Sequence, residues 1–509
     1  MRSVLQAVGG LLFGVAIVVG FELLLRVLGV GEGAPHHDPF AGFSSAVPTF
    51  EPVVRADGTR IFQLSPARRA NRRLRHLSEP QREFLAEKPA GAFRIFVVGS
   101  SSAEGIPYST RYAFSTWLER RLAASLPDLR VEVVNAAFSG YASRRLLPVV
   151  EEIARYQPDL LVLYMGHNEW AERMYYEHLL RLDPRLFRVL EWGYQTRIYA
   201  LASRILDVEA FAPPSPLDVD PGANTFQMFG VFRSRAKGRD YPTPRELGYR
   251  DLLYENNVRA MANAMKPVGA RVLFCTLSQN FSDWPPPASR HRDGLGPDEL
   301  REWERAFGEG RRLAAGADCN AALGAFEQAL AIDDRYADLQ FRVATCLRSL
   351  GRLPEAKQRF RLASDLDPVS HGAPTYFNEI LRRVAREEGG LFVDVDRLLE
   401  DASGPRLVGD DLFTDFAHPN LRAHRLIAAA LSDALRAAGL PRPAEQWHDG
   451  YVEPELRQLY RDEPELRIRE LESRVFVCLL APREACAEEA QQLLALQPQN
   501  EIAARVLRE

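Results

Sequence analysis

Four short segments of the chain carry residue types that together can perform acyl transfer. The first, GSSSAEG, contains Ser101, and the second, NAAFSG, ends in Gly140. The third, MGHNE, contains Asn168, and the fourth, DFAHPN, contains Asp415 and His418. A serine can attack an ester carbonyl when a histidine takes its proton and a carboxylate orients that histidine. Each segment by itself is also compatible with an ordinary turn or a helix cap.

The spacing within the last segment favours a carboxylate and imidazole pair. Asp415 precedes His418 by three residues, just before an expected helix at 422–438. A carboxylate beside one ring nitrogen fixes the tautomer and leaves the other nitrogen to accept the proton of the nucleophile. The Gly140 N–H and the Asn168 amide would donate hydrogen bonds to the oxyanion, and such a donor contributes about 3–4 kcal/mol in acyl transfer.

Short, apolar, β-branched strands precede the first three segments. Strands alternating with amphipathic helices predict βαβ units and a parallel sheet. The expected strands are 93–98, 130–134, 160–164, 271–277 and 391–395, and the helices between them include 111–125, 144–156, 257–265 and 376–388. Because reactive groups in such sheets gather beyond the carboxyl ends of the strands, we predict the site at that edge.

In this order the four segments resemble the sequence blocks of the SGNH/GDSL hydrolase family, which is named for Ser, Gly, Asn and His. The family pattern G-D/E/G-S falls on residues 99–101 and selects Ser101 rather than Ser100 or Ser102 as the nucleophile. The block ending in glycine falls on 135–140, G-x-N-D on 166–169 with Glu169 in place of Asp, and D-x-x-H on 415–418. Ser100, at a position that is usually acidic or glycine, is the main departure.

The resemblance implies a flavodoxin-like three-layer α/β/α domain with about five parallel strands, in two parts at 93–300 and 371–440. It implies a serine esterase that needs no cofactor and no metal. Ser101, Asp415 and His418 would form the catalytic triad, and Gly140 and Asn168 the oxyanion hole. The expected substrate is a small acyl group, such as O-acetyl on envelope carbohydrate. The same residues would also serve acyl transfer to a sugar.

Longer strings are similar to a bacterial subgroup that joins a membrane helix to tetratricopeptide repeats. Residues 4–20 carry no charge, and Glu22 and Arg26 are the charges within 21–30, so 1–30 is predicted to be a single-pass membrane anchor. A cleaved signal peptide is the alternative. The catalytic domain would lie on the extracytoplasmic, periplasmic side, as a hypothesis.

Between the anchor and the first strand, residues 31–92 are rich in Pro, Gly and Arg and are interpreted as a membrane-proximal arm. Its arginines would meet anionic lipid or an anionic polymer, or belong to a solvated linker. They are Arg55, Arg60, Arg68, Arg69, Arg72, Arg73 and Arg75.

Two insertions and a tail complete the chain. The first insertion, about 169–250, has no assigned role. The second, 301–370, repeats itself after 34 residues, the tetratricopeptide period, although a plain helical hairpin is the alternative. The matched positions are Ala322, Phe326 and Ala329 with Ala356, Phe360 and Ala363. Both insertions leave from the carboxyl edge of the sheet, so we expect them to wall the cleft. Residues 441–509 are predicted to be a helical extension.

Composition narrows the classes of function. A net charge of -4 over 509 residues gives no reason to expect nucleic acid as a partner. Five cysteines without any CxxC spacing indicate isolated buried thiols rather than a zinc site or a disulfide framework. The alternative to an esterase is a catalytically weak envelope scaffold whose repeats bind a protein partner.

Overall fold

The structure is a computed structural model, and it describes residues 2–30, 40, 42–65, 68, 82–172, 183–206, 241–369, 372–479 and 482–508. Arg69, Arg72, Arg73, Arg75 and the proline-rich part of the first insertion, near residues 213–221, lie outside the described residues.

A five-stranded parallel sheet forms the centre of the molecule, with the order β5-β4-β6-β7-β8. Its strands are β4 (Phe93–Gly99), β5 (Val131–Asn135), β6 (Leu160–Tyr164), β7 (Arg271–Cys275) and β8 (Leu391–Val393). β4 and β6 are buried along their whole length, as expected for uninterrupted apolar runs in a covered sheet. The predicted five strands are confirmed, and numbered along the chain their order is the flavodoxin-like 2-1-3-4-5.

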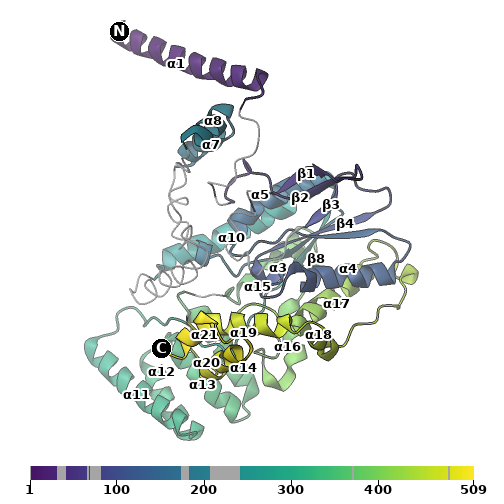
Figure 1. Cartoon of the computed structure of the whole chain (residues 1–509). Coiled ribbons are helices and arrows are strands. Elements are labelled where there is room, and N and C mark those ends of the chain that lie inside the picture. Colours follow the sequence, from purple (N-terminus) through teal and green to yellow (C-terminus); the bar gives the residue numbers. More distant parts are fainter. Residues whose placement is uncertain are drawn as a thin grey trace.

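Helices cover both faces of this sheet (Figure 1). On one face α4 (Phe114–Ser125) packs against α17 (Leu421–Ala437), with α16 (Val395–Ser403) beside α17. On the other face α10 (Pro244–Met265) packs against both α5 (Ser143–Ile153) and α15 (Phe377–Glu387). The arrangement is therefore the predicted three-layer α/β/α unit.

Part of the predicted arm is instead a second sheet. β1 (Phe50–Val54), β2 (Arg60–Leu64) and β3 (Glu83–Leu85) pair antiparallel in sequence order. The hairpin between β1 and β2 turns at Gly58, whose φ of 82° suits glycine. Phe84 packs edge-on against Phe96 of β4 with ring centroids 5.3 Å apart, which attaches this sheet to the main core.

The arginines of this part that the structure describes bind protein groups. Arg68 is 2% exposed and donates hydrogen bonds to the carbonyls of Ser44 at 3.1 Å and Val47 at 2.8 Å. Arg55 pairs with Glu83. The expectation that these arginines face lipid, polymer or solvent is therefore wrong for Arg68, which is buried within the fold. The Arg55 side chain remains 46% exposed while it pairs with Glu83, so it still faces solvent.

The N-terminal segment forms a helix, α1 (Arg2–Val27). Arg26 pairs with Glu22 at 2.8 Å, and Glu22 accepts the backbone N–H groups of Arg197 at 2.9 Å and Ile198 at 3.1 Å. Over the part of the chain that the structure describes, no helix is long and apolar enough to cross a membrane. The predicted membrane-spanning anchor is not supported: Glu22 and Arg26 interrupt the apolar run, and Glu22 holds another helix.

The described helices of the first insertion lie with α1, away from the central sheet (Figure 1). They are α7 (Pro184–Tyr194) and α8 (Arg197–Leu206). Tyr194 packs with Phe40 and Val47 in a small apolar cluster. The prediction that this insertion walls the cleft is therefore wrong for these two helices, since α8 packs against α1 and Tyr194 of α7 packs against Phe40 and Val47 instead.

The second insertion consists of four helices that pack consecutively: α11 (Pro297–Ala315), α12 (Cys319–Ile332), α13 (Ala337–Ser349) and α14 (Leu353–Leu366). The six matched repeat positions are all at most 1% exposed. A Cβ at Gly310 would lie 2.4 Å from the Phe326 ring, so glycine permits the close approach of α11 and α12. The helical hairpins are confirmed, and their tetratricopeptide identity stays a prediction.

The tail is helical as predicted, with α18 (Leu456–Asp462), α19 (Glu465–Cys478), α20 (Cys486–Leu496) and α21 (Glu501–Val506). A disulfide joins Cys478 to Cys486 across the turn between α19 and α20. The expectation of isolated thiols is therefore wrong for this pair, whose separation of eight residues is no recognisable motif. Cys275, Cys319 and Cys346 are free thiols.

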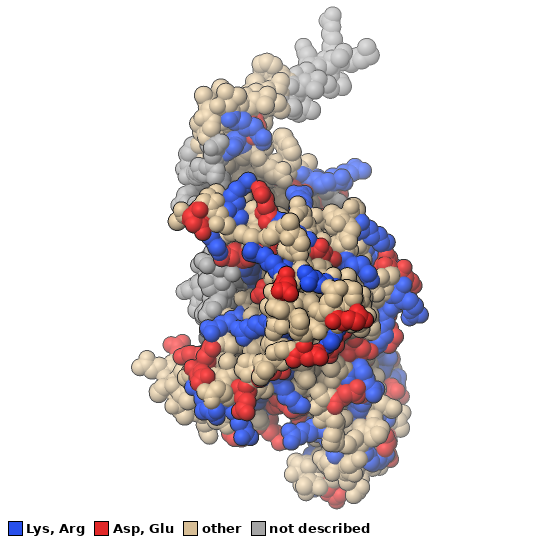
Figure 2. Space-filling view, turned by 90° about the vertical axis from the view of Figure 1, so that its right-hand side faces the viewer, with Lys and Arg blue, Asp and Glu red and all other residues tan. Residues whose placement is uncertain are grey.

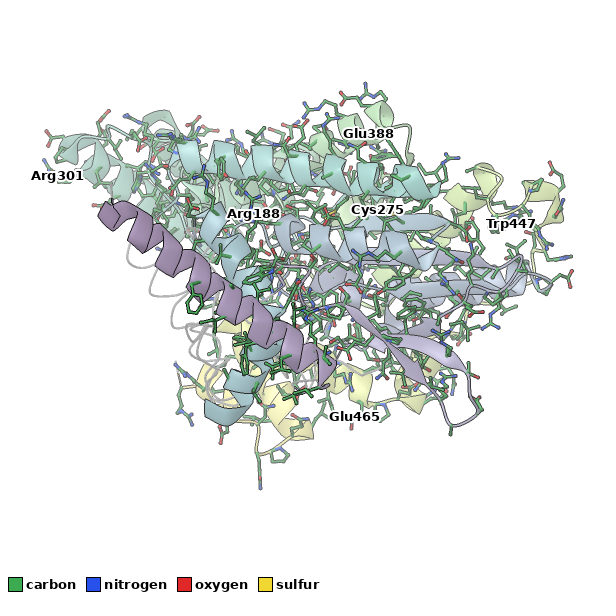
Figure 3. All side chains as sticks on the ribbon, turned by 90° about the horizontal axis from the view of Figure 1, so that it is seen from above. Arg188, Cys275, Arg301, Glu388, Trp447 and Glu465 are labelled. Carbon is green, nitrogen blue, oxygen red and sulfur yellow. A yellow bond between two sulfur atoms is a disulfide. The ribbon has the colours of Figure 1, made fainter. Side chains whose placement is uncertain are left out.

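Charges of both signs are interspersed over the face shown in Figure 2, in keeping with the net charge of -4. Seen from above, Arg301 of α11 and Trp447 lie at opposite ends of the molecule, and Cys275 of β7 lies between them (Figure 3). The Cys275 side chain is fully buried.

Candidate active site

The turn after β4 presents the predicted nucleophile. β4 ends at Gly99, and the short helix α3 (Ser101–Glu104) begins two residues later. A Cβ at Gly99 would lie 2.2 Å from the carbonyl oxygen of Tyr164, so only glycine lets the end of β4 lie so close to β6. Ser101 is partly exposed at the carboxyl edge of the sheet.

Hydrogen bonds bring together three of the five predicted site residues. His418 Nε2 lies 2.8 Å from Ser101 Oγ, and His418 Nδ1 lies 2.7 Å from Asp415 Oδ2 and 2.9 Å from Oδ1. With its proton on Nδ1 facing the carboxylate, the imidazole presents Nε2 as the acceptor for the serine hydroxyl. This is the geometry of a serine nucleophile with its base and orienting acid.

Asp415 is fully buried and held ionised. Burial raises its pKa, but the charge of His418 and the hydrogen bonds from His418, Ser473 and the Ala417 N–H outweigh that effect, so the pKa lies below its ordinary value. The Ala417 and His418 backbone N–H groups each donate to Oδ1 at 3.0 Å. The carboxylate therefore has the charge needed to orient an imidazole that becomes protonated.

The two neighbouring serines have different surroundings. Ser102 Oγ donates a hydrogen bond of 3.0 Å to the carbonyl of Ala417, which ties the nucleophile turn to the loop of Asp415 and His418. Ser100 is fully buried. Of the three, it is the Ser101 hydroxyl that contacts the imidazole.

The two predicted oxyanion donors lie on adjacent loops at the same edge. Gly140 follows β5 with a φ of 75°, and Asn168 follows β6. The Asn168 amide donates to the carbonyl of Tyr141 at 3.2 Å, and the Phe138 N–H donates to the carbonyl of Gly99 at 3.0 Å. Hydrogen bonds thus join Asn168 to the Gly140 loop, and that loop to the end of β4.

A buried ion pair that the sequence analysis did not select supports the Gly140 loop. Glu104 accepts the backbone N–H of Ser139 at 2.7 Å and pairs with Arg82 at 2.7 Å. Both side chains are 3% exposed. The signal was present in the sequence, since Glu104 is a charged residue three positions after the nucleophile. Its role depends on Arg82, which is distant along the chain.

Two buried glutamates hold the loop after β6 against the start of α5. Glu169, where the family has Asp, accepts the Ser143 N–H at 2.7 Å, and Glu172 accepts the Ala142 N–H at 2.8 Å. Burial, with the nearby charge of Glu172, raises the pKa of Glu169 to about 8. Burial also raises the pKa of Glu172 to about 7, against the lowering effect of Arg145. Glu169 therefore supports the position of Asn168.

Two further histidines surround the triad and are held neutral. His167 Nδ1 accepts the Ala373 N–H at 3.0 Å, and His424 Nδ1 accepts the Phe114 N–H at 3.2 Å. Burial, with the charge of His418, lowers the pKa of each to about 3. Neither is suited to take a proton from Ser101, which leaves His418 as the candidate base.

The C-terminal helices also reach this site. Ser473 Oγ of α19 lies 2.5 Å from Asp415 Oδ2. Sequence reasoning missed this contact, because a serine within a helix carries no motif and lies 58 residues from its partner.

A cavity of about 50 Å³ lies beside the loop that joins Asp415 to His418. Phe416 lines it, and the Phe416 and His418 rings have centroids 5.9 Å apart. The prediction that the repeat insertion lies at the catalytic edge is confirmed, because α13 and α14 form one wall. The main lining residues are Gln279, Asn280, Phe281, Trp284, Pro285, Pro286, Pro287, Phe341, Phe360, Ser364, Asp367, Phe416 and Val477.

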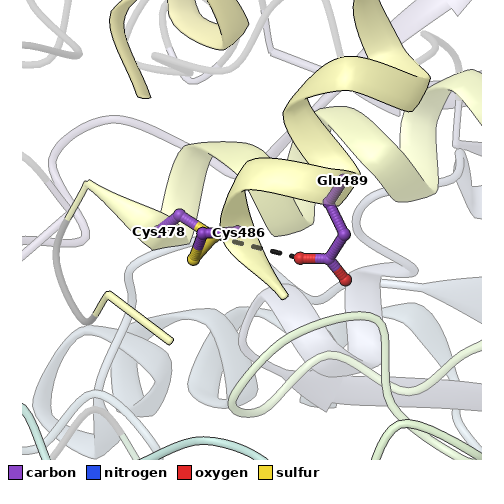
Figure 4. Close-up of side chains that lie close together, drawn as sticks. All are labelled: Cys478, Cys486 and Glu489. Carbon is purple, nitrogen blue, oxygen red and sulfur yellow. Dashed lines mark hydrogen bonds between the residues drawn. A yellow bond between two sulfur atoms is a disulfide. The ribbon is translucent and has the colours of Figure 1, made fainter. Parts of the chain in front are cut away.

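Cys478, Cys486 and Glu489 come close enough together to resemble a metal site (Figure 4). The two sulfur atoms are bonded to each other, so they are not thiolates, the form in which cysteine binds metals. This cluster is therefore a structural crosslink between α19 and α20.

Comparison with known proteins identifies the family. Residues 97–339 match the GDSL-like lipase/acylhydrolase family. The matched range includes Ser101, Gly140 and Asn168, and Asp415 and His418 follow it. No curated protein matches the chain.

Solved structures resemble the chain at low identity. A crystal structure of TesA is 14% identical with a TM-score of 0.29, covering 68% of this chain and 98% of TesA. The acetylxylan esterase Axe2 from Geobacillus stearothermophilus is 12% identical with a TM-score of 0.30, covering 68% of this chain and 95% of Axe2. A putative GDSL-like lipase from Parabacteroides merdae is 12% identical with a TM-score of 0.30, covering 68% of this chain and 97% of the lipase.

At TM-scores this low the assignment depends on the family match, which spans the segments of Ser101, Gly140 and Asn168. Residues 97–339 match the GDSL-like lipase/acylhydrolase family, and this match identifies the chain as a hydrolase of ester bonds.

Proposed function

We propose that the chain is a serine esterase that removes or transfers small acyl groups, with O-acetyl groups on envelope carbohydrate as the substrate class. Ser101, His418 and Asp415 act as the catalytic triad, and Gly140 and Asn168 form the oxyanion hole. The observation that carries the proposal is the 2.8 Å contact between His418 Nε2 and Ser101 Oγ, with Asp415 bound to the opposite ring nitrogen.

The proposed reaction has two halves. His418 Nε2 takes the hydroxyl proton as Ser101 Oγ attacks the ester carbonyl carbon, and the Gly140 N–H and the Asn168 amide stabilise the negative oxygen. Collapse of the intermediate breaks the ester bond, and His418 gives its proton to the departing alcohol. Water, or a sugar hydroxyl in the transfer reaction, then loses a proton to His418 and releases the acyl group from Ser101.

The cavity beside His418 supports a carbohydrate as the alcohol portion of the substrate. Its walls combine aromatic rings, including Trp284, Phe341 and Phe416, with the side-chain amides of Gln279 and Asn280. Aromatic walls with a few placed polar groups are typical of sites that orient a small ligand. The cavity itself, at about 50 Å³, is too small to enclose a sugar ring. A sugar would instead bind across its mouth, with its apolar face on these rings and its hydroxyls toward these amides.

The disulfide supports a location outside the cytoplasm. Disulfides form and persist in oxidising compartments and are rare where thiols are kept reduced. The bond between Cys478 and Cys486 therefore favours the extracytoplasmic side, where envelope carbohydrate is found. A protein partner for the repeats also stays a prediction.

Hydrolysis of phenyl acetate by the full chain, Ser101→Ala and His418→Ala tests the proposal. Both variants remove a member of a unit that acts together, so each should lower kcat by roughly 10⁴-fold or more. Ser349→Ala is the matched control: among the described residues, the Ser349 hydroxyl donates to the Thr345 carbonyl of its own helix, at 3.1 Å, and the activity should not change.

Equal background rates in the wild type and both variants would contradict hydrolysis by this triad. A second assay with phenyl acetate as donor and a sugar as acceptor separates transfer from hydrolysis: both release phenol, but transfer produces an acetylated sugar instead of acetate. A chain that performs neither reaction would refute the proposed function.

A further inference from the structure

One face of α19 meets three loops of the catalytic unit. Glu470, Ser473, Arg474 and Val477 lie three or four residues apart, so they share that face. The partners of these residues are Tyr108 after the nucleophile turn, the loop 410–415 before His418, and Trp284 beside the cavity. The helix therefore touches the surroundings of Ser101, of Asp415 and of the cavity at once.

Ser473 makes the most direct of these contacts. Its hydroxyl lies 2.5 Å from Asp415 Oδ2, the same oxygen that lies 2.7 Å from His418 Nδ1. An ionised carboxylate only accepts hydrogen bonds, so Ser473 is the donor. Oδ1 accepts the two backbone N–H groups of Ala417 and His418. Ser473 thus supplies the one side-chain hydroxyl among the described donors to Asp415.

The turns on either side of Ser473 are fixed to the catalytic unit. Tyr108 is fully buried, and its hydroxyl donates to Glu470 Oε1 at 2.5 Å. Arg474 donates to the carbonyls of Asp410 and Phe413, both at 3.5 Å, and pairs with Glu489 at 3.3 Å. These contacts set the height and rotation of α19, and so the direction of the Ser473 hydroxyl.

The disulfide fixes the C-terminal end of the same helix. Cys478 lies five residues after Ser473 and is bonded to Cys486 of α20. Both cysteines pack with Trp284 and Val477 in one apolar cluster, and Arg483 stacks on the Trp284 ring at 4.3 Å. The crosslink therefore lies where α19 meets the cavity wall.

We propose that Ser473 is a positioning residue of the active site: it holds Asp415 in the orientation that aligns His418 with Ser101. Helix α19 positions the Ser473 hydroxyl beside Asp415. The inference rests on the proposed function, because Asp415 matters only if His418 is the base. The C-terminal extension is then a working part of the hydrolase rather than an appendage.

The charged groups around Asp415 and His418 determine how loss of the Ser473 hydroxyl would change the pH dependence of kcat/KM. His167 after β6 and His424 on α17 face His418 and are held neutral by burial. On α19, Glu470 and Arg474 are paired with Arg467 and Glu489. Glu169 and Glu172, with pKa values raised to about 8 and 7, titrate within the assay range in the wild type and the variants alike. The difference between wild type and variant therefore reports Ser473: loss of its hydroxyl leaves more of the Asp415 charge to attract the imidazolium proton. The acid limb of kcat/KM should therefore move to higher pH.

Ser473→Ala, Ser473→Thr and Ser349→Ala in the full chain test this, with phenyl acetate as substrate from pH 5 to 9. Because hydrogen bonds to charged groups are among the stronger ones, Ser473→Ala should lower kcat/KM about three- to tenfold. It should also raise the midpoint of the acid limb by a few tenths of a pH unit. Ser473→Thr keeps a hydroxyl and should restore both, and Ser349→Ala should change neither.

Unchanged kcat/KM in Ser473→Ala, or a fall with an unmoved acid limb that Ser473→Thr does not restore, would overturn the proposal. A second readout does not need turnover: the downfield proton resonance of the bond between His418 and Asp415 should shift in Ser473→Ala and return in Ser473→Thr. If the wild type hydrolyses no ester, the proposed function fails while this resonance still tests Ser473. An unshifted resonance would refute the positioning role itself.

Discussion

The carboxyl edge of the sheet and the helical additions around it contribute to the same site in different ways. The edge supplies Ser101, Gly140 and Asn168 from the ends of β4, β5 and β6. The additions bring no member of the triad. Helices α13 and α14 wall the cavity beside Phe416, whereas α19 reaches Asp415 through Ser473.

The two regions therefore have different roles in the proposed reaction: the strand ends hold the reacting groups, and the helical additions orient them or line the cavity. Groups at the strand ends are fixed by the register of a buried sheet, so under the proposed function they act in the bond-breaking step whichever ester enters. The repeat helices contact the space that the alcohol portion of a substrate would occupy. Changes at the edge should therefore affect all esters, and changes in the cavity wall should affect large ones.

Asn168→Ala should lower the esterase activity more than a substitution in the cavity wall does. Loss of an oxyanion donor lowers kcat by about 10²- to 10³-fold, and the loss should be equal for phenyl acetate and for cellobiose octaacetate. Asn168→Asp keeps the size and removes the donor, so it should behave in the same way in steady-state assays. A loss confined to one substrate would move Asn168 from the oxyanion hole to the substrate site.

Phe341→Ala should discriminate between the same two substrates. Phe341 lines the cavity from α13 and is partly buried, so its truncation should raise KM for cellobiose octaacetate about tenfold and leave phenyl acetate unaffected. Leu362→Ala, at a side chain of α14 that is 38% exposed, is the matched control for damage to the repeat. Equal losses on both substrates would remove the distinction between the edge and the wall.

Glu169→Gln should give the smallest effect, on stability. Because burial holds the pKa of Glu169 near 8, the folded chain keeps a proton that the unfolded chain releases. Stability therefore falls as the pH rises from about 5 to 8. The variant stays neutral, so between pH 5.5 and 8.5 its Tm should fall less than that of the wild type, by about 2–4 °C. Glu151→Gln, at an exposed glutamate, should follow the wild type.

Much of the central unit could be predicted from the sequence, because local patterns determine it. Uninterrupted β-branched runs at 93–98 and 160–164 predicted β4 and β6, and the motifs directly after them placed Ser101 and Asn168 at one edge. The three-residue spacing of Asp415 and His418 was likewise local.

The features that were missed depend on contacts between distant segments. The sheet of β1, β2 and β3 lies in an arginine-rich stretch, and it is stable because Phe84 packs on Phe96. The Ser473 contact joins residues that are 58 positions apart. The disulfide is the exception, since it spans only eight residues but follows no recognisable motif. The apolar N-terminal run predicted a membrane span, whereas Glu22 in the structure holds the start of α8.

Covalent labelling tests the central claim most directly. A fluorophosphonate reacts with a serine that a neighbouring base has activated, so mass spectrometry of the full chain should find one adduct, on the peptide containing Ser101. Ser101→Ala should carry none, and His418→Ala should label far more slowly. An adduct on another serine, or equal labelling of Ser101→Ala and the wild type, would contradict the assignment of Ser101 and His418 as nucleophile and base.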